Sequence, residues 1–332
     1  MEKLLQWFTK YQRFIQMAIG VFSIGLVIWI VYINRDELRL LLNFQLWHLA
    51  TMIFVYILQF FVSALSLWLI ISRLGGKSVS TIDWIKIMLV SRMANYLMPK
   101  SGGIYKAFVL KKNYKIHYTK FIHIYAFFSW LTILINLGLV ALLILISMPD
   151  LEINNYLVFP IVAGLFLSIM FGPLLVNRVF NFYHPRSIFL SNLTEKIHEI
   201  FITMLNHGRD MNFMSKLIGT QILKFGLYVL LFKLLFAGLG VGIDSNYAKM
   251  ALFIAVEQMN VIFYITPGNI GITELLYGAI SSAIGVGVAE GVIAAALLRA
   301  IGYLVIFPFG IAFGGLKVYR SIKLQIGLEE NA

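Results

Sequence analysis

Long apolar stretches separated by short polar segments dominate the pattern along this chain of 332 residues. Crossing the ~30 Å hydrocarbon core of a bilayer takes about 20 apolar residues in a helix. Stretches of that length occupy residues 14–33, 48–71, 121–146, 157–176, 217–239 and 292–316. The pattern therefore predicts an all-α polytopic membrane protein, with the first stretch as an uncleaved anchor.

Two shorter apolar regions are interrupted by proline and glycine in the same order. Residues 96–106 and 264–274 both read Tyr-x-x-Pro-x-x-x-Gly-Ile-x-charge, with Pro99 and Gly103 in the first copy and Pro267 and Gly271 in the second. Proline removes a backbone donor and glycine loosens the chain, so each copy should interrupt a helix. Paired interrupted segments in the two halves of a chain are typical of the substrate site of a transporter with an inverted repeat.

The distribution of charge between the stretches predicts the topology. Residues 99–120 contain six lysines and no acid, and residues 177–216 add five Lys or Arg residues. The loops at 148–156 and 240–247 contain acids but no Lys or Arg. An excess of Lys and Arg marks the cytoplasmic side. We therefore expect the lysine-rich loop and both terminal tails, residues 1–13 and 317–332, to be cytoplasmic.

The predicted cytoplasmic position of the Lys- and Arg-rich loops is kept if the two interrupted regions are re-entrant hairpins. Residues 81–98 would dip into the membrane and return through 102–110, and residues 248–288 would do the same from the opposite face. The prediction is a single membrane domain over residues 1–332, with six full spans, two re-entrant hairpins and an inverted repeat. If residues 248–265 and 272–288 each cross the membrane instead, there are eight full spans. The last span still starts from the same side of the membrane, so both termini remain cytoplasmic.

Composition excludes several classes of function. The chain is 60% hydrophobic and 13% charged, whereas a soluble domain has about 25% charged residues. The net charge of +12 sits in the loops, so we expect the surface of the cell's inner (cytoplasmic) membrane, and not nucleic acid, to be the partner. With no cysteine, scattered histidines and no phosphate loop, we predict no metal and no cofactor. An oligomer is compatible with the sequence.

Polar residues within the apolar stretches carry the chemical argument, because ionisable groups at membrane depth usually face a cavity or one another. Glu257, Asn260 and Tyr264 fall on one helical face at spacing i, i+3, i+7. Gln221, Lys224 and Tyr228 form a similar polar stripe, and Arg92 lies one turn before Asn95.

This inventory suits the phosphate of a lipid headgroup. Helix amino-termini freed at the two breaks would present N–H groups to it, and Arg and Lys would add charge-assisted hydrogen bonds. Glu257 or Glu274 could neutralise the cations or carry a proton. Structural roles compete with this interpretation: Arg299 could pair with Glu257 or Glu290, Glu274 could cap the helix after Gly271, and Lys106 could belong only to the cytoplasmic lysine cluster.

The motif residues also point to a known family. The first element contains Asn95, Pro99, Gly103 and Lys106; the second contains Pro267, Gly268, Gly271 and Glu274, and Arg299 follows in the last helix. Over nearly the whole chain, the pattern resembles the flippase-like membrane domain of lysylphosphatidylglycerol synthases and their stand-alone relatives. The chain differs at Ile104, where many relatives have an acid, and at Ser129-Trp130, in place of an acid-Arg pair.

The resemblance implies movement or handling of a lipid. Because the chain ends at Ala332, we expect no soluble aminoacyltransferase domain. The leading hypothesis is a flippase or transporter, not an enzyme, for a phosphate-bearing lipid such as a phospholipid or a polyprenyl-linked intermediate. The alternatives are a membrane enzyme or subunit that transfers a glycosyl or aminoacyl group to such a lipid, a small-solute secondary transporter, and a structural scaffold. The predicted binding residues are Arg92, Asn95, Pro99, Gly103, Lys106, Lys224, Glu257, Asn260, Tyr264, Pro267, Gly268, Gly271, Glu274 and Arg299.

Overall fold

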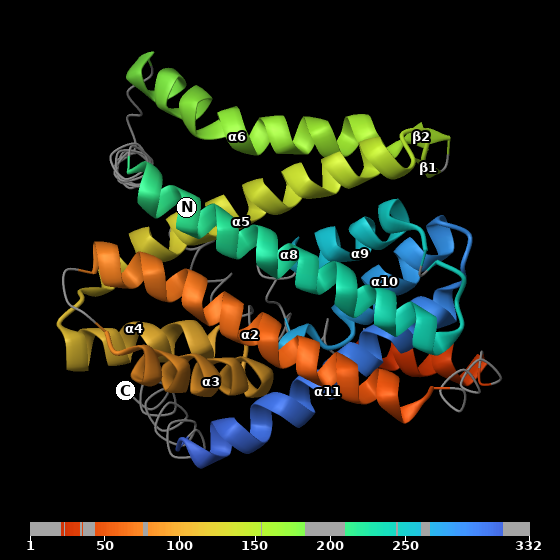
Figure 1. Cartoon of the computed structure of the whole chain (residues 1–332), viewed down its shortest axis with the longest axis horizontal. Helices are drawn as coiled ribbons and strands as arrows, with labels where there is room; N and C mark the ends of the chain where they lie inside the picture. The colour runs from red at the N-terminus through yellow and green to blue at the C-terminus, as the bar shows by residue number, and fades with distance from the viewer. Residues whose placement is uncertain are drawn as a thin grey trace, which may run out of the picture.

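Helices account for almost all of the described chain (Figure 1). The computed structural model describes residues 21–22, 24–33, 35, 44–75, 79–153, 155–182, 210–243, 245–259 and 266–314, without the side chains of residues 173–182 and 259. In this part, four helices are long and apolar enough to cross a membrane: α2 (Leu46–Leu74), α5 (Tyr118–Ser147), α8 (Met211–Leu239) and α11 (Val288–Ala312). Shorter apolar helical stretches cover Ile24–Ile33 and the first part of α6 (Val158–Phe182). The predicted all-α polytopic membrane fold is confirmed.

The first interrupted region is a helical hairpin formed by α3 (Thr81–Leu97) and α4 (Ser101–Tyr114). Its open ends lie together, because Tyr114 Oη donates a hydrogen bond to Asp83 Oδ2 over 3.3 Å. Near the tip, Ser91 Oγ donates to the Gly102 carbonyl over 2.8 Å. A Cβ on Gly102 would lie 2.1 Å from the Ser91 carbonyl oxygen, so only glycine allows this close approach of the two helices.

The second interrupted region is also a hairpin, formed by α9 (Tyr247–Met259) and α10 (Ile272–Ala283) with the 3-10 turn η2 (Pro267–Asn269) between them. Lys249 Nζ, near the start of α9, donates to the carbonyl of Ile284, just after α10, over 2.9 Å. Helix α10 has 12 residues, or about 18 Å, less than the ~30 Å hydrocarbon core. This length favours a re-entrant hairpin over two full spans.

The two hairpins open at opposite ends of the long helices, as Figure 1 shows. At the first end, Arg73 near the end of α2 pairs with Asp210, directly before α8, over 2.8 Å, and α3 begins close by. At the other end, Asn246, directly before α9, donates to Met148, directly after α5. A two-stranded turn, β1 (Glu152–Ile153) with β2 (Tyr156–Leu157), lies beyond α5 at this second end. The chain thus builds an inverted pair of hairpins.

The long helices hold the hairpins in place through a mixed interior. Helix α2 packs along α8, and Gln221 Nε2 of α8 donates to Ser66 Oγ of α2 over 2.7 Å. Aromatic rings of α8, α9 and α10 contact one another in tilted and edge-to-face arrangements, in one core cluster that includes Phe232, Phe253 and Tyr277. Helix α11 packs against both hairpins, along α10 and along α3. This framework brings the tips of the two hairpins together near the middle of the long helices.

Candidate functional site

A cavity of about 110 Å³ lies between the two hairpin tips. Each tip contributes to the wall, with Tyr96 near the end of α3 and Gly268 in η2. Six helices and the η2 turn line the cavity through Tyr56, Gln59, Arg92, Tyr96, Tyr228, Leu231, Glu257, Gly268, Asn269, Thr273, Tyr277, Ala295, Leu298 and Arg299. Since a buried water needs only about 10–15 Å³ measured in this way, the space holds several waters or one small polar group.

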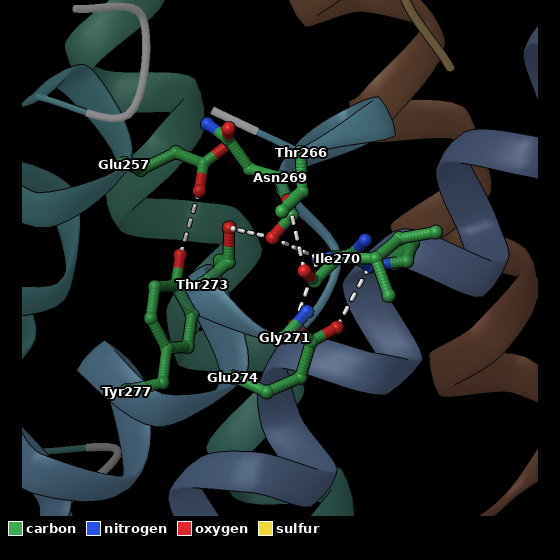
Figure 2. Close-up of polar contacts among 9 residues, drawn as sticks. Glu257, Thr266, Asn269, Ile270, Gly271, Thr273, Glu274 and Tyr277 are labelled. Carbon is green, nitrogen blue, oxygen red and sulfur yellow. Dashed lines mark hydrogen bonds and ion pairs between the residues drawn. The ribbon is translucent and has the colours of Figure 1, made fainter. Parts of the chain in front are cut away.

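A buried ion pair fixes the second hairpin tip. Arg299 Nε lies 2.8 Å from Glu274 Oε1, and Arg299 Nη2 donates to Glu274 Oε2 over 3.0 Å and to the Asn269 carbonyl over 3.2 Å. The side chains are only 13% and 6% exposed. Figure 2 shows Glu274 turned toward Gly271, whose N–H donates to Oε2 over 2.8 Å. Glu274 therefore caps α10, as one interpretation predicted, and also holds Arg299.

The predicted structural pairing of Arg299 with Glu257 or Glu290 is wrong. Glu274 is the partner because it projects from the first turn of α10 toward the side of α11 that carries Arg299. Glu257 instead accepts a hydrogen bond from Tyr277 Oη over 2.9 Å and lines the cavity (Figure 2). The two glutamates thus have different surroundings.

Arg92 lines the cavity on the side of the first hairpin. Its guanidinium carbon lies 5.8 Å from the centre of the Tyr56 ring and 5.6 Å from that of Phe60, both on α2. Such cation–π contacts contribute about 0.5–2 kcal/mol each, more when the groups are desolvated. One turn further along α3, Tyr96 Oη lies 3.1 Å from Tyr56 Oη. Helices α2 and α3 therefore form a wall of one arginine and two tyrosines.

Two buried lysines flank this wall without lining the cavity. Lys224 Nζ donates to Gln258 Oε1 over 3.1 Å and lies 5.7 Å from the centre of the Tyr228 ring. Lys106 Nζ lies 4.9 Å from the centre of the Tyr125 ring. Both are close enough to Arg92 for the like charges to repel. The region around Arg92 is therefore rich in positive charge.

One N–H group at each helix amino-terminus beside the breaks already donates to a side chain. The Gly102 N–H donates to Asn95 Oδ1 over 2.7 Å, and the Gly271 N–H donates to Glu274. Neither group is available to the phosphate that we expected at these termini. Arg92 and Arg299 are the cationic side chains among the residues that line the cavity.

The structure brings some of the predicted residues together and separates others. Four of them line the cavity: Arg92, Glu257, Gly268 and Arg299. Gly271, Glu274, Lys224 and Asn95 support residues near it through the hydrogen bonds described above. Asn260 and Tyr264 lie outside the described residues.

The prolines themselves do not line the cavity within the described part of the chain, which corrects the expectation for Pro99 and Pro267. They bend the chain at the tips, while their neighbours Tyr96 and Gly268 face inward. Gly103 also lies away from the cavity, with open space where a Cβ would be.

Sequence reasoning missed several polar residues of the wall. Tyr56 and Gln59 share one face of α2, and Thr273 and Tyr277 share one face of α10. In the sequence, these residues could have been recognised as polar pairs at spacing i, i+3 or i, i+4 within an apolar stretch. Gln59 in particular is almost completely buried.

Comparison with known proteins identifies the family. Residues 15–310 match the family model described as "Lysylphosphatidylglycerol synthase TM region". No curated protein and no solved structure is similar enough to count as a match. Since the family model covers most of the chain and includes both hairpins, the chain belongs to the lysylphosphatidylglycerol synthase TM region family.

Proposed function

We propose that this protein moves a lipid with a phosphate-bearing headgroup, such as a phospholipid or a polyprenyl-linked intermediate, across the cytoplasmic membrane. The headgroup passes through the cavity between the hairpin tips. The observation that carries this proposal is that Arg92, Glu257 and Arg299 line one cavity within a membrane-spanning fold. Charges at this depth are costly, and they usually mark the path of a substrate.

The balance of charge favours an anionic group. Arg299 pairs with Glu274, Lys224 lies near Glu257, and both Lys106 and Lys224 lie near Arg92. A phosphate would add negative charge beside this group of cations and accept charge-assisted hydrogen bonds from Arg92. The tyrosines around it supply hydroxyl groups that can donate to the same oxygens.

The arrangement of the hairpins supports movement across the membrane. Two hairpins that enter from opposite ends and meet at one cavity give a headgroup a route from either face, as in transporters built from inverted repeats. The cavity of about 110 Å³ suits a phosphate group but not a complete lipid, so the chains would remain in the bilayer.

We place the protein in the inner membrane with the open end of the α3–α4 hairpin in the cytoplasm. Lys111, Lys112, Lys115 and Lys120 lie at this end, in the last turn of α4, directly after it and in the first turn of α5, and an excess of lysine marks the cytoplasmic side. The α9–α10 hairpin then enters from outside, and both termini are cytoplasmic.

The first experiment follows a fluorescent lipid in proteoliposomes. The probe is phosphatidylethanolamine with an NBD group on its amine, so that phosphate is the only charge of the headgroup. External dithionite destroys the dye on lipids that reach the outer leaflet. We expect Arg92→Gln to slow lipid movement about tenfold or more, since a hydrogen bond to a charged group contributes about 1.5–3 kcal/mol.

Lys86→Gln is the matched control, because Lys86 lies on the same helix but forms an exposed ion pair with Asp83. It should move the lipid at the wild-type rate. Equal rates for well-folded Arg92→Gln and wild type would contradict the proposed role of the cavity.

A further inference from the structure

A second hollow, of about 230 Å³, lies between α2 and α3. Apart from one threonine, its lining is apolar and aromatic: Phe61, Val62, Leu65, Trp68, Thr81, Trp84 and Ile85. Phe61 and Leu65 are 44% and 41% exposed, so this groove is open on the outside of the helix bundle. In a membrane, that surface faces hydrocarbon.

The groove lies along the same seam as the polar cavity. Trp68 Nε1 donates to the Val79 carbonyl over 2.7 Å, and Trp84 Nε1 donates to the Ala64 carbonyl over 2.8 Å, which fixes α2 beside α3 in antiparallel register. Further along these two helices lie the cavity residues Tyr56, Gln59, Arg92 and Tyr96. Ile85 in the groove and Arg92 in the cavity are separated by about 10 Å along α3.

Side chains, not backbone, close the seam beside the cavity. The Tyr56 and Tyr96 hydroxyls meet across it at 3.1 Å, and Arg92 lies over the Phe60 ring. Gly302 of α11 lies directly behind the two hydroxyls, because a Cβ there would be 2.7 Å from Tyr96 Oη and 2.9 Å from Tyr56 Oη. Between the groove residue Phe61 and the cavity residue Gln59, the ring of Phe60 closes the seam, since it lies 5.9 Å from the Phe61 ring and 5.6 Å from the Arg92 guanidinium carbon.

We propose that the α2–α3 groove holds one hydrocarbon chain of the lipid whose phosphate group occupies the cavity. The seam between the two helices is then the route by which the headgroup leaves the bilayer, past the Phe60 ring beside Arg92. This inference rests on the proposed function, since it requires a lipid headgroup in the cavity. The physical reason is that an amphipathic lipid needs an apolar path next to a polar one, and the seam provides both.

Photolabelling tests this assignment directly. The full chain is reconstituted in phosphatidylcholine vesicles with a trace of phosphatidic acid that carries a diazirine in one acyl chain. After illumination, labelled peptides are identified by mass spectrometry. We expect severalfold more labelling of residues 61–68 and 81–85 than of the surface of α8 around Leu223, which is 55% exposed.

Two variants distinguish labelling by a lipid bound in the groove from labelling by the surrounding bilayer. Leu65→Trp fills the groove, and Arg92→Gln removes the charge that holds the headgroup, so each should reduce groove labelling to the level of the α8 surface. Leu223→Trp should leave groove labelling unchanged. Equal labelling of both surfaces, or groove labelling that is unaffected by Arg92→Gln, would mean ordinary bilayer contact only and would overturn the proposal.

The fluorescent-lipid assay separates failure of this inference from failure of the proposed function. If wild type moves lipid while groove labelling is independent of Arg92, the groove assignment fails and the function stands. If wild type moves no lipid while groove labelling depends on Arg92, the proposed function fails and the groove remains a lipid-binding site.

Discussion

At the scale of single residues, the two glutamates near the cavity differ in what they can do. Glu274 accepts hydrogen bonds from the Gly271 N–H and from Arg299, so its charge is compensated within the protein. Glu257 contacts Tyr277 and lines the cavity. A substrate that enters the cavity would meet Glu257 directly, whereas Glu274 stabilises the hairpin tip.

Removing the charge of Arg299 should therefore destabilise the protein. Arg299→Gln leaves Glu274 buried without its cation, and breaking a buried pair in this way costs about 3–5 kcal/mol. Thermal unfolding of the purified protein in detergent measures the effect. Lys86→Gln, which breaks an exposed pair, should unfold at the wild-type temperature. A wild-type unfolding temperature for Arg299→Gln would show that the pair is not structural.

Side-chain partners were the part of the site that the sequence predicted least well. Helical position singled out Arg92 and Glu257, the family resemblance singled out Arg299, and all three line the cavity. Spacing within one helix does not specify which residue of another helix lies opposite. For this reason the pairing of Arg299 with Glu274, and the contribution of Tyr56 from α2, emerged only from the packing.

At the scale of the elements, proline and glycine predicted the two breaks, and the charge of the loops favoured hairpins at both. The lysine-rich loop required the first hairpin to return to the side from which it entered, and Tyr114 and Asp83 do lie together. The position of each proline relative to the cavity was not predictable, because it depends on how far each tip reaches past the neighbouring helices. Tyr96, three residues before Pro99, and Gly268, directly after Pro267, face the cavity instead.

The adjacent glycines at the first tip provide a matched test of the hairpin. A Cβ on Gly102 would lie 2.1 Å from the Ser91 carbonyl oxygen, whereas Gly103 has open space at that point. Gly102→Ala should destabilise the protein by about 1–3 kcal/mol through overpacking. Gly103→Ala should be neutral or stabilising by up to about 1 kcal/mol, because alanine favours a helix. Thermal unfolding distinguishes the two, and equal effects would contradict the close packing of α3 on α4.

At the scale of the whole molecule, the inverted pair of hairpins requires a defined topology. Helix α5 runs for 30 residues between Asn113 in α4 and Asp150, which follows the helix, and both of these residues are exposed. The chain contains no cysteine, so single cysteines at these positions can be labelled selectively. We expect an impermeant maleimide to label Asp150→Cys from outside intact cells and Asn113→Cys only after the membrane is opened. Labelling of both from the same side would exclude this topology.

The central claim is that a headgroup passes between the two hairpin tips, so the tips must be able to separate. A Cβ on Gly268 would lie 3.1 Å from Tyr96 Cδ1 and 3.7 Å from Tyr96 Cα, a distance compatible with a bridge between cysteines at these two positions. In the double variant Tyr96→Cys/Gly268→Cys, an oxidant should link the tips and a reductant should release them. Each single variant serves as a control for the oxidant.

The decisive measurement is the rate of fluorescent-lipid movement by this double variant in proteoliposomes, before and after reduction. We predict that movement stops in the oxidised protein and resumes in the same sample once the bridge is reduced. Lipid movement at the same rate in the fully bridged and the reduced protein would contradict the account.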